Sequence, residues 1–266
     1  MTPDLPGVQL SLEGAIGRLD LARPDKLNPL STATLTALRD AARWFDDQPE
    51  CKVVIVGGQG RVFSAGADLS SFTGGAPAPD QPLGRDAADR GRIMADAIEA
   101  MRAVTVARLH GWCVGGGVVL AAACDLRVAT DDTRFSIPEV DLGIPLAWGG
   151  IPRLVREIGP ARTKELVMTC RPFDAAEALA MGFVNRVVPV DELDGAVAEL
   201  AEQLAAKAGQ ALRATKAHTN AVTAAMVGLS RSWADADGLE TGLHDPEGRA
   251  AAQRYLDELT ARRSEA

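Results

Sequence analysis

Apolar and polar residues alternate at the start of the chain and predict strands there. The segments Val8–Leu12 and Ala15–Leu21 have the two-residue period of half-buried strands, and Glu13-Gly14 between them predicts the turn of a β-hairpin. Two later runs, Lys52–Val56 and Val104–Leu109, are short, apolar and rich in β-branched residues. Such runs are typical of fully buried strands, so a sheet is expected in this half of the chain.

Helical periodicity separates these strands and dominates the end of the chain. One helix is predicted to begin near residue 32, and a second is predicted over residues 86–101. Their expected buried faces are Leu35, Leu38, Ala42 and Phe45 in the first and Ile93, Ala97, Ile98 and Met101 in the second. Helical patterns also fill most of the chain after residue 190. This order predicts an α/β core over residues 1–190 and a helical region over residues 191–266.

The stretch 109–125, LHGWCVGGGVVLAAACD, changes character at three consecutive glycines, Gly115, Gly116 and Gly117. The segment Val118–Cys124 is too apolar for a surface helix, so a glycine turn followed by a buried helix is predicted. The first N–H groups of a helix have no acceptor within it, and they suit an anion or a developing oxyanion. Tight packing of a buried helix would also require glycines, and the cluster alone does not distinguish the two explanations.

Composition and charge exclude several classes of function. The net charge of -8 and the pI of about 5.0 argue against nucleic acid as the main partner. The four cysteines show no C-x-x-C spacing and are expected to be reduced residues of a cytoplasmic protein. The sequence shows no signal-peptide pattern and no apolar run of about 18 residues, so no membrane association is expected. No metal-ligand spacing is present, and no third glycine completes a nucleotide-binding motif after Gly58 and Gly60.

Three passages, taken in order, resemble the enoyl-CoA hydratase/isomerase (crotonase) superfamily. They are FSAGADL at Phe63–Leu69, HGWCVGGG at His110–Gly117 and FSIPEVDLGIP at Phe135–Pro145. The segment ARPDKLNPL at Ala22–Leu30 is also similar to the family's connection between an early strand and the first helix. Order and spacing match from about residue 8 to residue 190, and the helical tail is similar in length. No single passage is specific, but the ordered set is.

This resemblance implies a spiral of ββα units with a C-terminal helical region used for trimer contacts. It also implies acyl-CoA thioester substrates, so coenzyme A would enter as part of the substrate and no separate cofactor is expected. A homotrimer or a dimer of trimers is therefore predicted. The apolar stripe Leu193, Val197, Leu200 and Leu204 in the tail is expected to need cover from a second subunit.

The family's device for thioester chemistry is a pair of backbone N–H groups that hold the thioester oxygen as it becomes an enolate. In this sequence the matching positions are Ala67 and Gly116. The resemblance implies that the adenine of coenzyme A lies near Ala65 and the pantetheine passes Lys26 and Leu27.

Two further features border the implied coenzyme A site. Asp68, in the same motif as Ala67, is expected to fix the oxyanion loop through hydrogen bonds to the backbone. The Gly- and Pro-rich segment Ser70–Arg85 is expected to be a loop that borders the acyl pocket.

The sequence departs from the hydratase pattern at one acid. Hydratases of this family use two glutamates, and this chain keeps the second, Glu139, but has Val119 at the first position. A single buried glutamate is suited to carry a proton from one carbon of an enoyl-CoA to another, as in the Δ3,Δ2-enoyl-CoA isomerases. Dienoyl-CoA isomerases match less well, because their acidic positions are Val119 and Ala147 here.

Three alternatives remain open at this point. Glu139 could activate water alone in a hydratase or hydrolase, or the chain could be a non-catalytic acyl-CoA-binding protein. Glu139 itself could be a solvated loop residue; in an apolar pocket its neutral form would be favoured instead. Two other polar residues near the glycine turn have simpler explanations: His110 is expected to be a hydrogen-bonded packing residue, and Asp125 is expected to end the buried helix.

Overall fold

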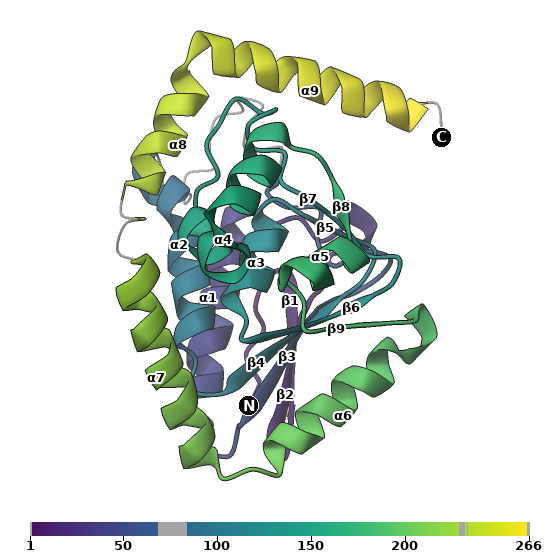
Figure 1. The fold of residues 1–266 in the computed structure, drawn as a ribbon, viewed down its shortest axis with the longest axis vertical. Helices are drawn as coiled ribbons and strands as arrows, with labels where there is room; N and C mark the ends of the chain where they lie inside the picture. The colour runs from purple at the N-terminus through teal and green to yellow at the C-terminus, as the bar shows by residue number, and fades with distance from the viewer. Residues whose placement is uncertain (1, 69–83, 229–231, 233, 265–266) are drawn as a thin grey trace.

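Two β-sheets form the centre of the part of the molecule that the structure describes (Figure 1). The structure is a computed structural model and describes residues 2–68, 84–228, 232 and 234–264. In spatial order the larger sheet contains β1 (Val8–Glu13), β2 (Ile16–Leu21), β3 (Val53–Gly58), β4 (Val104–Leu109), β6 (Leu126–Thr130) and β9 (Arg186–Val188). β1 and β2 form the predicted antiparallel hairpin, and the later neighbours pair in parallel. Of the predicted loop Ser70–Arg85, only Gly84 and Arg85 are among the described residues, and the rest lies outside them.

A smaller sheet positions the residues that surround the glycine turn. It contains β5 (Trp112–Val114), β7 (Arg134–Ser136) and β8 (Phe173–Asp174), with β5 between the predicted strand and the glycines. Helices of the core are α1 (Thr32–Asp46), α2 (Arg85–Ala100), α3 (Gly116–Ala123), α4 (Gly150–Thr169) and α5 (Ala175–Met181). The tail contains α6 (Leu193–Ala205), α7 (Gly209–Val227), α8 (Asp235–His244) and α9 (Pro246–Ser264). The α/β fold with a C-terminal helical region is thus confirmed.

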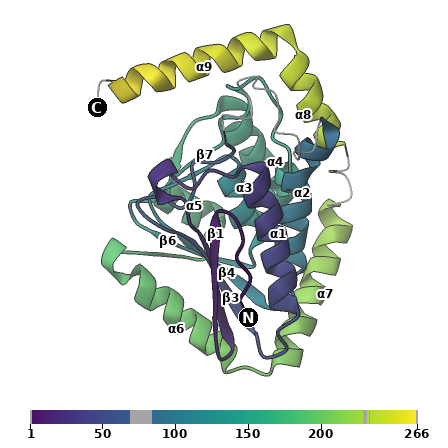
Figure 2. The same ribbon diagram turned by 180° about the vertical axis from the view of Figure 1, so that it is seen from behind.

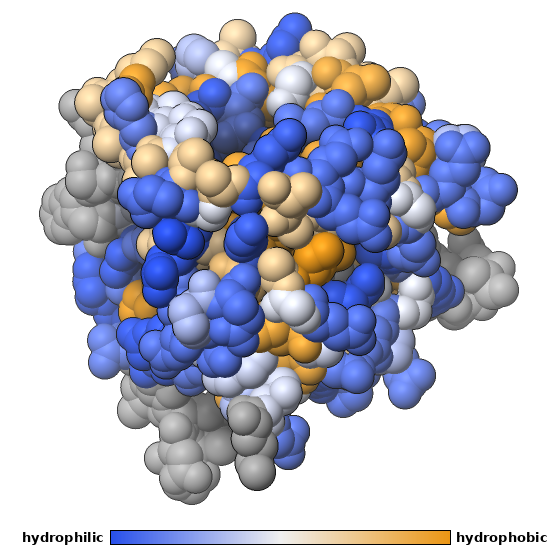
Figure 3. Space-filling view, turned by 90° about the horizontal axis from the view of Figure 1, so that it is seen from below, coloured by the Kyte–Doolittle hydropathy of each residue, from blue (hydrophilic) through white to orange (hydrophobic). Residues whose placement is uncertain are grey.

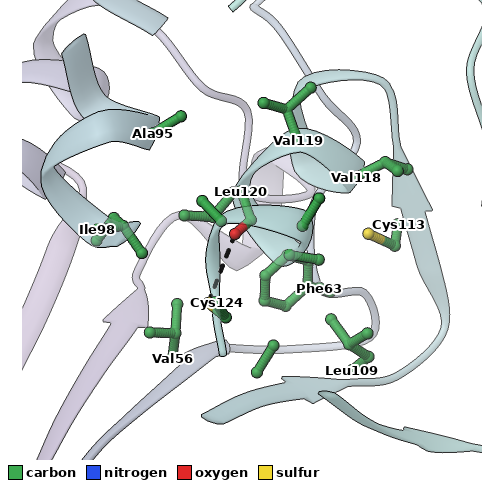
Figure 4. Packing of buried hydrophobic residues seen from close by; sticks show 14 of the residues in the cluster. Val56, Phe63, Ala95, Ile98, Leu109, Cys113, Val118, Val119, Leu120 and Cys124 are labelled. Atoms are coloured by element: carbon green, nitrogen blue, oxygen red, sulfur yellow. Dashed lines mark hydrogen bonds between the residues drawn. The ribbon is translucent and has the colours of Figure 1, made fainter. Parts of the chain in front are cut away.

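The two faces of the larger sheet are covered by different helices. Along β3, Val54 and Val56 face the main core with the helices α1 to α3, whereas Val53 and Ile55 face α6. This alternation is the two-residue period of a strand buried on both sides. The helix α3 is surrounded by apolar side chains, among them Phe63 (Figure 4). The glycine turn therefore begins a helix that is fixed on all sides.

Two details of these elements differ from the sequence prediction. The strand β3 continues through Gly57 and Gly58, because both pair with β2. Neighbouring groups lie so close that a Cβ at either glycine would collide with them. The buried face of α2 is centred on Met94, Ala95 and Ile98 rather than on Ile93 and Ala97. That face also contains Ala88 and Gly91, and small residues of this kind leave little trace in an apolar pattern.

The apolar stripe of the tail, Leu193, Val197, Leu200 and Leu204, is covered in part by the sheet of its own chain. Leu193, Val197 and Ala201 of α6 are buried against the larger sheet of the same chain, and Leu200 and Leu204 pack beside them. Leu200 and Leu204 stay partly exposed in the single chain, and the trimer or dimer of trimers stays a prediction. The last helix of the tail, α9, runs across one end of the molecule, next to α8 (Figures 1 and 2).

The surface agrees with the composition of the chain. The face seen from below is mostly hydrophilic, and its hydrophobic residues form separate patches (Figure 3). No helix among the described residues is long and apolar enough to span a membrane. Cytoplasmic location stays a prediction.

Candidate active site

Three motif segments that are distant in sequence lie side by side at the start of α3. The Ser64 N–H donates to the Trp112 carbonyl (3.1 Å), and the Val114 N–H donates to the Ser64 carbonyl (3.0 Å). On the other side of the same segment, the Leu30 N–H donates to the carbonyl of Gly66 (2.8 Å). The loop that contains Ala67 is therefore held between the segment that precedes α1 and the strand β5.

Glycines allow the close approach at this junction. Gly66 has a φ of +88°, and a Cβ there would lie 2.7 Å from the Val114 carbonyl oxygen. Gly115 has a φ of +49°, and a Cβ there would lie 2.5 Å from Oε1 of Glu139. Both conformations favour glycine. At Gly117, a Cβ would lie 3.0 Å from that of Ser64. Close packing thus requires the glycine cluster. The absence of a Cβ at Gly115 also lets the Glu139 carboxylate lie against the start of α3.

Two backbone donors are left available beside Glu139. Gly116 is the first residue of α3, and Ala67 lies in the loop clamped against β5. Within the described residues, neither N–H donates to a protein acceptor. Ala67, Gly116 and Glu139 line one common pocket. The structure therefore brings together the predicted oxyanion donors and the predicted acid.

Glu139 follows β7 in a loop that is tied to the glycine turn. The Gly115 N–H donates to the Ser136 carbonyl at the end of β7 (2.8 Å), which fixes where this loop begins. The Oε2 atom of Glu139 is inaccessible to solvent and has no hydrogen-bond partner among the described residues. Burial raises the pKa of Glu139 from 4.5 to about 7. The solvated-loop alternative for Glu139 is therefore excluded.

The rest of the pocket is apolar. Glu139 is the only ionisable side chain among its described lining residues, which include Val119, Ile144, Leu146, Ala147, Trp148 and Leu239. Val119 and Ala147, the two positions at which the family resemblance would place a further acid, thus line the pocket with aliphatic groups. Leu239 belongs to α8, so the helical tail contributes to the pocket wall.

The four residues of the predicted coenzyme A site lie on two backbone segments, which a hydrogen bond joins. Lys26 is exposed at the end of a short 3₁₀-helix (Pro24–Lys26), and Leu27 follows in a left-handed conformation with a φ of +63°. The Ala65 N–H donates to the Leu27 carbonyl (2.9 Å), which joins the two predicted contact regions. Asp68 lies 3.8 Å from an Arg23 guanidinium nitrogen. This arrangement leaves Lys26 accessible to a phosphate.

Asn28 was missed by the sequence analysis and holds this segment in place. It is 1% exposed, and its side-chain amide donates to the carbonyls of Gln59, Val62 and Phe63. Its φ of +53° is one that asparagine tolerates better than most residues. The signal was present in ARPDKLNPL, where an asparagine precedes a proline, but its long-range partners are not visible in sequence.

The remaining polar candidates have structural roles. His110 Nε2 contacts the Gly60 carbonyl (2.9 Å) and burial lowers its pKa, as expected for a packing residue. The Asp125 carboxylate accepts hydrogen bonds from the N–H and hydroxyl of Thr105 and pairs with Lys216 at 2.7 Å. Asp125 therefore attaches α7 to the core, which is more than the helix-ending role expected from sequence. No cluster of potential metal ligands occurs in the described part of the chain.

The buried carboxyl of Glu139 makes stability depend on pH. Because its pKa is about 7 in the folded protein and 4.5 ordinarily, the folded state holds the proton more tightly between these values. The free energy of unfolding should therefore fall as pH rises through this window, by up to roughly 3 kcal/mol. We expect Glu139→Gln to be more stable than the wild type at about pH 8 and to lose this advantage at about pH 4. Urea unfolding at both pH values measures the difference; an equal difference at both would contradict the raised pKa.

Comparison with known proteins identifies relatives along nearly the whole chain. The sequence model of the enoyl-CoA hydratase/isomerase family matches residues 11–262. A crotonyl-CoA hydratase of Syntrophomonas wolfei is 35% identical over 212 residues, which cover 79% of this chain and 80% of the relative. A peroxisomal Δ(3,5)-Δ(2,4)-dienoyl-CoA isomerase of Arabidopsis thaliana is 34% identical over 224 residues, with 79% of both proteins covered.

The fold is shared with solved structures. An enoyl-CoA hydratase from Mycobacterium avium subsp. paratuberculosis K-10 matches with a TM-score of 0.84 and 28% identity, over 95% of this chain and 100% of that one. The motif passages, the fold and the sequence relatives agree with one another. The chain therefore belongs to the enoyl-CoA hydratase/isomerase (crotonase) family and is an acyl-CoA enzyme of hydratase or isomerase type.

Proposed function

We propose that this protein is a Δ3,Δ2-enoyl-CoA isomerase of fatty-acid metabolism, which moves a double bond by proton transfer on one glutamate. The observation that carries the proposal is the pocket beside Glu139, where no other described lining residue is ionisable. Val119 supplies methyl groups where the second acid of a hydratase would be needed to orient water. One carboxyl and two N–H donors suffice for proton transfer between carbons.

The proposed reaction begins with ionised Glu139 and a 3-enoyl-CoA. The carboxylate removes a proton from C2, and the electron pair of that C–H bond forms an enolate on the thioester oxygen. The N–H groups of Ala67 and Gly116 hold this oxygen as its charge develops. Collapse of the enolate forms the C2–C3 double bond while the C3–C4 double bond breaks, and Glu139 returns the proton to C4. Atoms, electrons and charge balance without a further reactant.

The environment of Glu139 supports both halves of this cycle. A general acid–base group works best when its pKa lies near the operating pH, and burial raises the pKa of Glu139 to about 7. The apolar wall around Oε2 also limits exchange of the proton with water. The substrate's coenzyme A is expected to lie along Lys26, Leu27, Ala65 and Asp68, where Lys26 would meet a phosphate as a point charge.

Hydration of a 2-enoyl-CoA is the second candidate, favoured by a specific observation. The crotonyl-CoA hydratase relative is 35% identical over most of its length. In this alternative, Glu139 alone would have to position water and exchange protons with it. A purely binding role is not supported, since the named relatives are enzymes and a binding protein has no need of a buried acid.

Initial rates on two substrates test the proposal. We expect the purified protein to convert a short 3-enoyl-CoA to its 2-enoyl isomer faster than it hydrates the matching 2-enoyl-CoA, by at least about 100-fold, the lower range of one general acid–base contribution. Ultraviolet absorbance of the conjugated thioester follows both reactions. Equal rates would favour the hydratase, and hydration without isomerisation would overturn the proposal.

A further inference from the structure

The pocket beside Glu139 is almost filled by protein. Its volume is about 30 Å³, which is far too small for a long acyl chain. Trp148 lines it and is packed against two glycines on different helices, Gly91 of α2 and Gly116 of α3. A Cβ added at either glycine would collide with the indole ring. The ring therefore occupies space directly beside a proposed oxyanion donor.

The backbone of Trp148 is in a conformation that tryptophan rarely adopts. Its φ is +60°, and the next residue, Gly149, has a φ of +69°. A bulky residue in this region is strained unless its surroundings hold it there. Strain of this kind, retained next to a pocket, indicates that the position of the indole ring is important for what the pocket binds.

Buried hydrogen bonds hold this corner of the chain from three helices. Arg153 of α4 is fully buried and donates to the carbonyls of Trp148 and Gly149, both at 3.3 Å. The Arg153 guanidinium is itself fixed by the Glu99 carboxylate of α2 at 2.8 Å. The Asp235 carboxylate of α8 accepts the Gly149 N–H at 2.8 Å. Moving the ring out of the pocket by a backbone shift would break these contacts.

The wall formed by α8 and the loop before α4 leaves the Trp148 ring little room to rotate. Leu239 and Ala236 of α8 pack with Ile144 and Ala147, and Trp148 lies against this cluster as well as against the main core. The ring is thus held between the core and the helical tail.

We propose that Trp148 is the specificity-determining residue of the acyl pocket and restricts the enzyme to short acyl groups. A longer acyl chain would have to displace a ring whose backbone is fixed by Arg153 and Asp235. The inference rests on the proposed function only in taking this pocket as the acyl site; it does not depend on which reaction Glu139 catalyses.

Binding of two saturated, unreactive thioesters tests the inference on the wild-type protein. Each additional buried methylene ordinarily strengthens binding about fourfold. We expect octanoyl-CoA to bind the wild type no more tightly than butyryl-CoA, as measured by titration calorimetry. Octanoyl-CoA binding tighter by the full methylene increment would overturn the inference. Failure of both thioesters to bind would overturn the proposed function, and the inference with it.

Trp148→Gly tests the ring directly, because glycine accepts the positive φ without strain. We expect this variant to bind octanoyl-CoA roughly 10- to 100-fold more tightly relative to butyryl-CoA than the wild type does. Trp148→Phe, which keeps an aromatic ring, should retain most of the wild-type preference. The matched control is Trp112→Ala, since Trp112 is 43% exposed in β5 and should leave the ratio unchanged. An unchanged ratio in folded Trp148→Gly would overturn the inference.

Discussion

Replacing Glu139 with glutamine is expected to lower turnover of an enoyl-CoA by about 100- to 10,000-fold while leaving affinity for an unreactive acyl-CoA nearly intact. Glutamine keeps the volume of the side chain but cannot accept the C2 proton. Binding should persist because the N–H groups of Ala67 and Gly116 belong to the backbone. Kinetics with a short 3-enoyl-CoA, together with calorimetry on a saturated thioester, separate the two effects.

The pH profile gives the same prediction a second readout. Since Glu139 must be ionised to act as the base, kcat/KM of the wild type should rise through a pH near its pKa of about 7. The residual activity of Glu139→Gln should lack this step. Glu177→Gln is a matched control, because Glu177 of α5 pairs with Arg171 and does not line the pocket. Wild-type turnover in Glu139→Gln would exclude Glu139 as the base.

Gly66→Ala is expected to lower kcat/KM by roughly 100- to 1,000-fold, the typical cost of one lost oxyanion donor. The added Cβ would lie 2.7 Å from the Val114 carbonyl oxygen, in a residue with a φ of +88°. The loop must shift to relieve this contact, and the Ala67 N–H shifts with it. Side-chain replacement at Ala67 itself would not test the donor, because the donor is in the backbone.

Backbone strain alone could also lower activity, and Gly14 provides the control for it. Gly14 has a φ of +56° in the β1–β2 turn, and a Cβ there would meet nothing within 4 Å. Gly14→Ala should therefore lose stability through similar backbone strain but keep its kcat/KM. Equal losses of activity in the two variants would show that strain, and not the position of the Ala67 N–H, is responsible.

Most elements of the fold follow from local patterns in the sequence. The β1–β2 hairpin and α1 are visible in the two-residue and helical periods of their apolar residues, and α1 begins at Thr32, as predicted, with Ser31 as its cap. The buried face of α2 was misplaced because Gly91 is buried against Trp148, a contact across 57 positions that no periodicity records. The α6 stripe was recognised correctly as apolar, but the sequence does not say which surface covers it.

The candidate site shows the same division between local and distant information. The ordered motif passages indicated that Ala67, Gly116 and Glu139 belong together, and the structure places all three on one pocket. Asn28, Trp148 and Arg153 were not found, because their roles depend on buried partners far away in the chain. The left-handed conformation of Trp148 likewise has no signature in the sequence, because tryptophan usually avoids it.

The central claim is that one buried carboxyl carries the proton between two carbons, and isotope transfer tests it most directly. A short 3-enoyl-CoA labelled with deuterium at C2 is converted in ordinary water, and the product is analysed by NMR. Because Oε2 of Glu139 is closed to solvent, we predict that part of the deuterium taken from C2 appears at C4 of the 2-enoyl product. A 3-hydroxyacyl product, or a 2-enoyl product with no deuterium at C4, would contradict the single-glutamate mechanism.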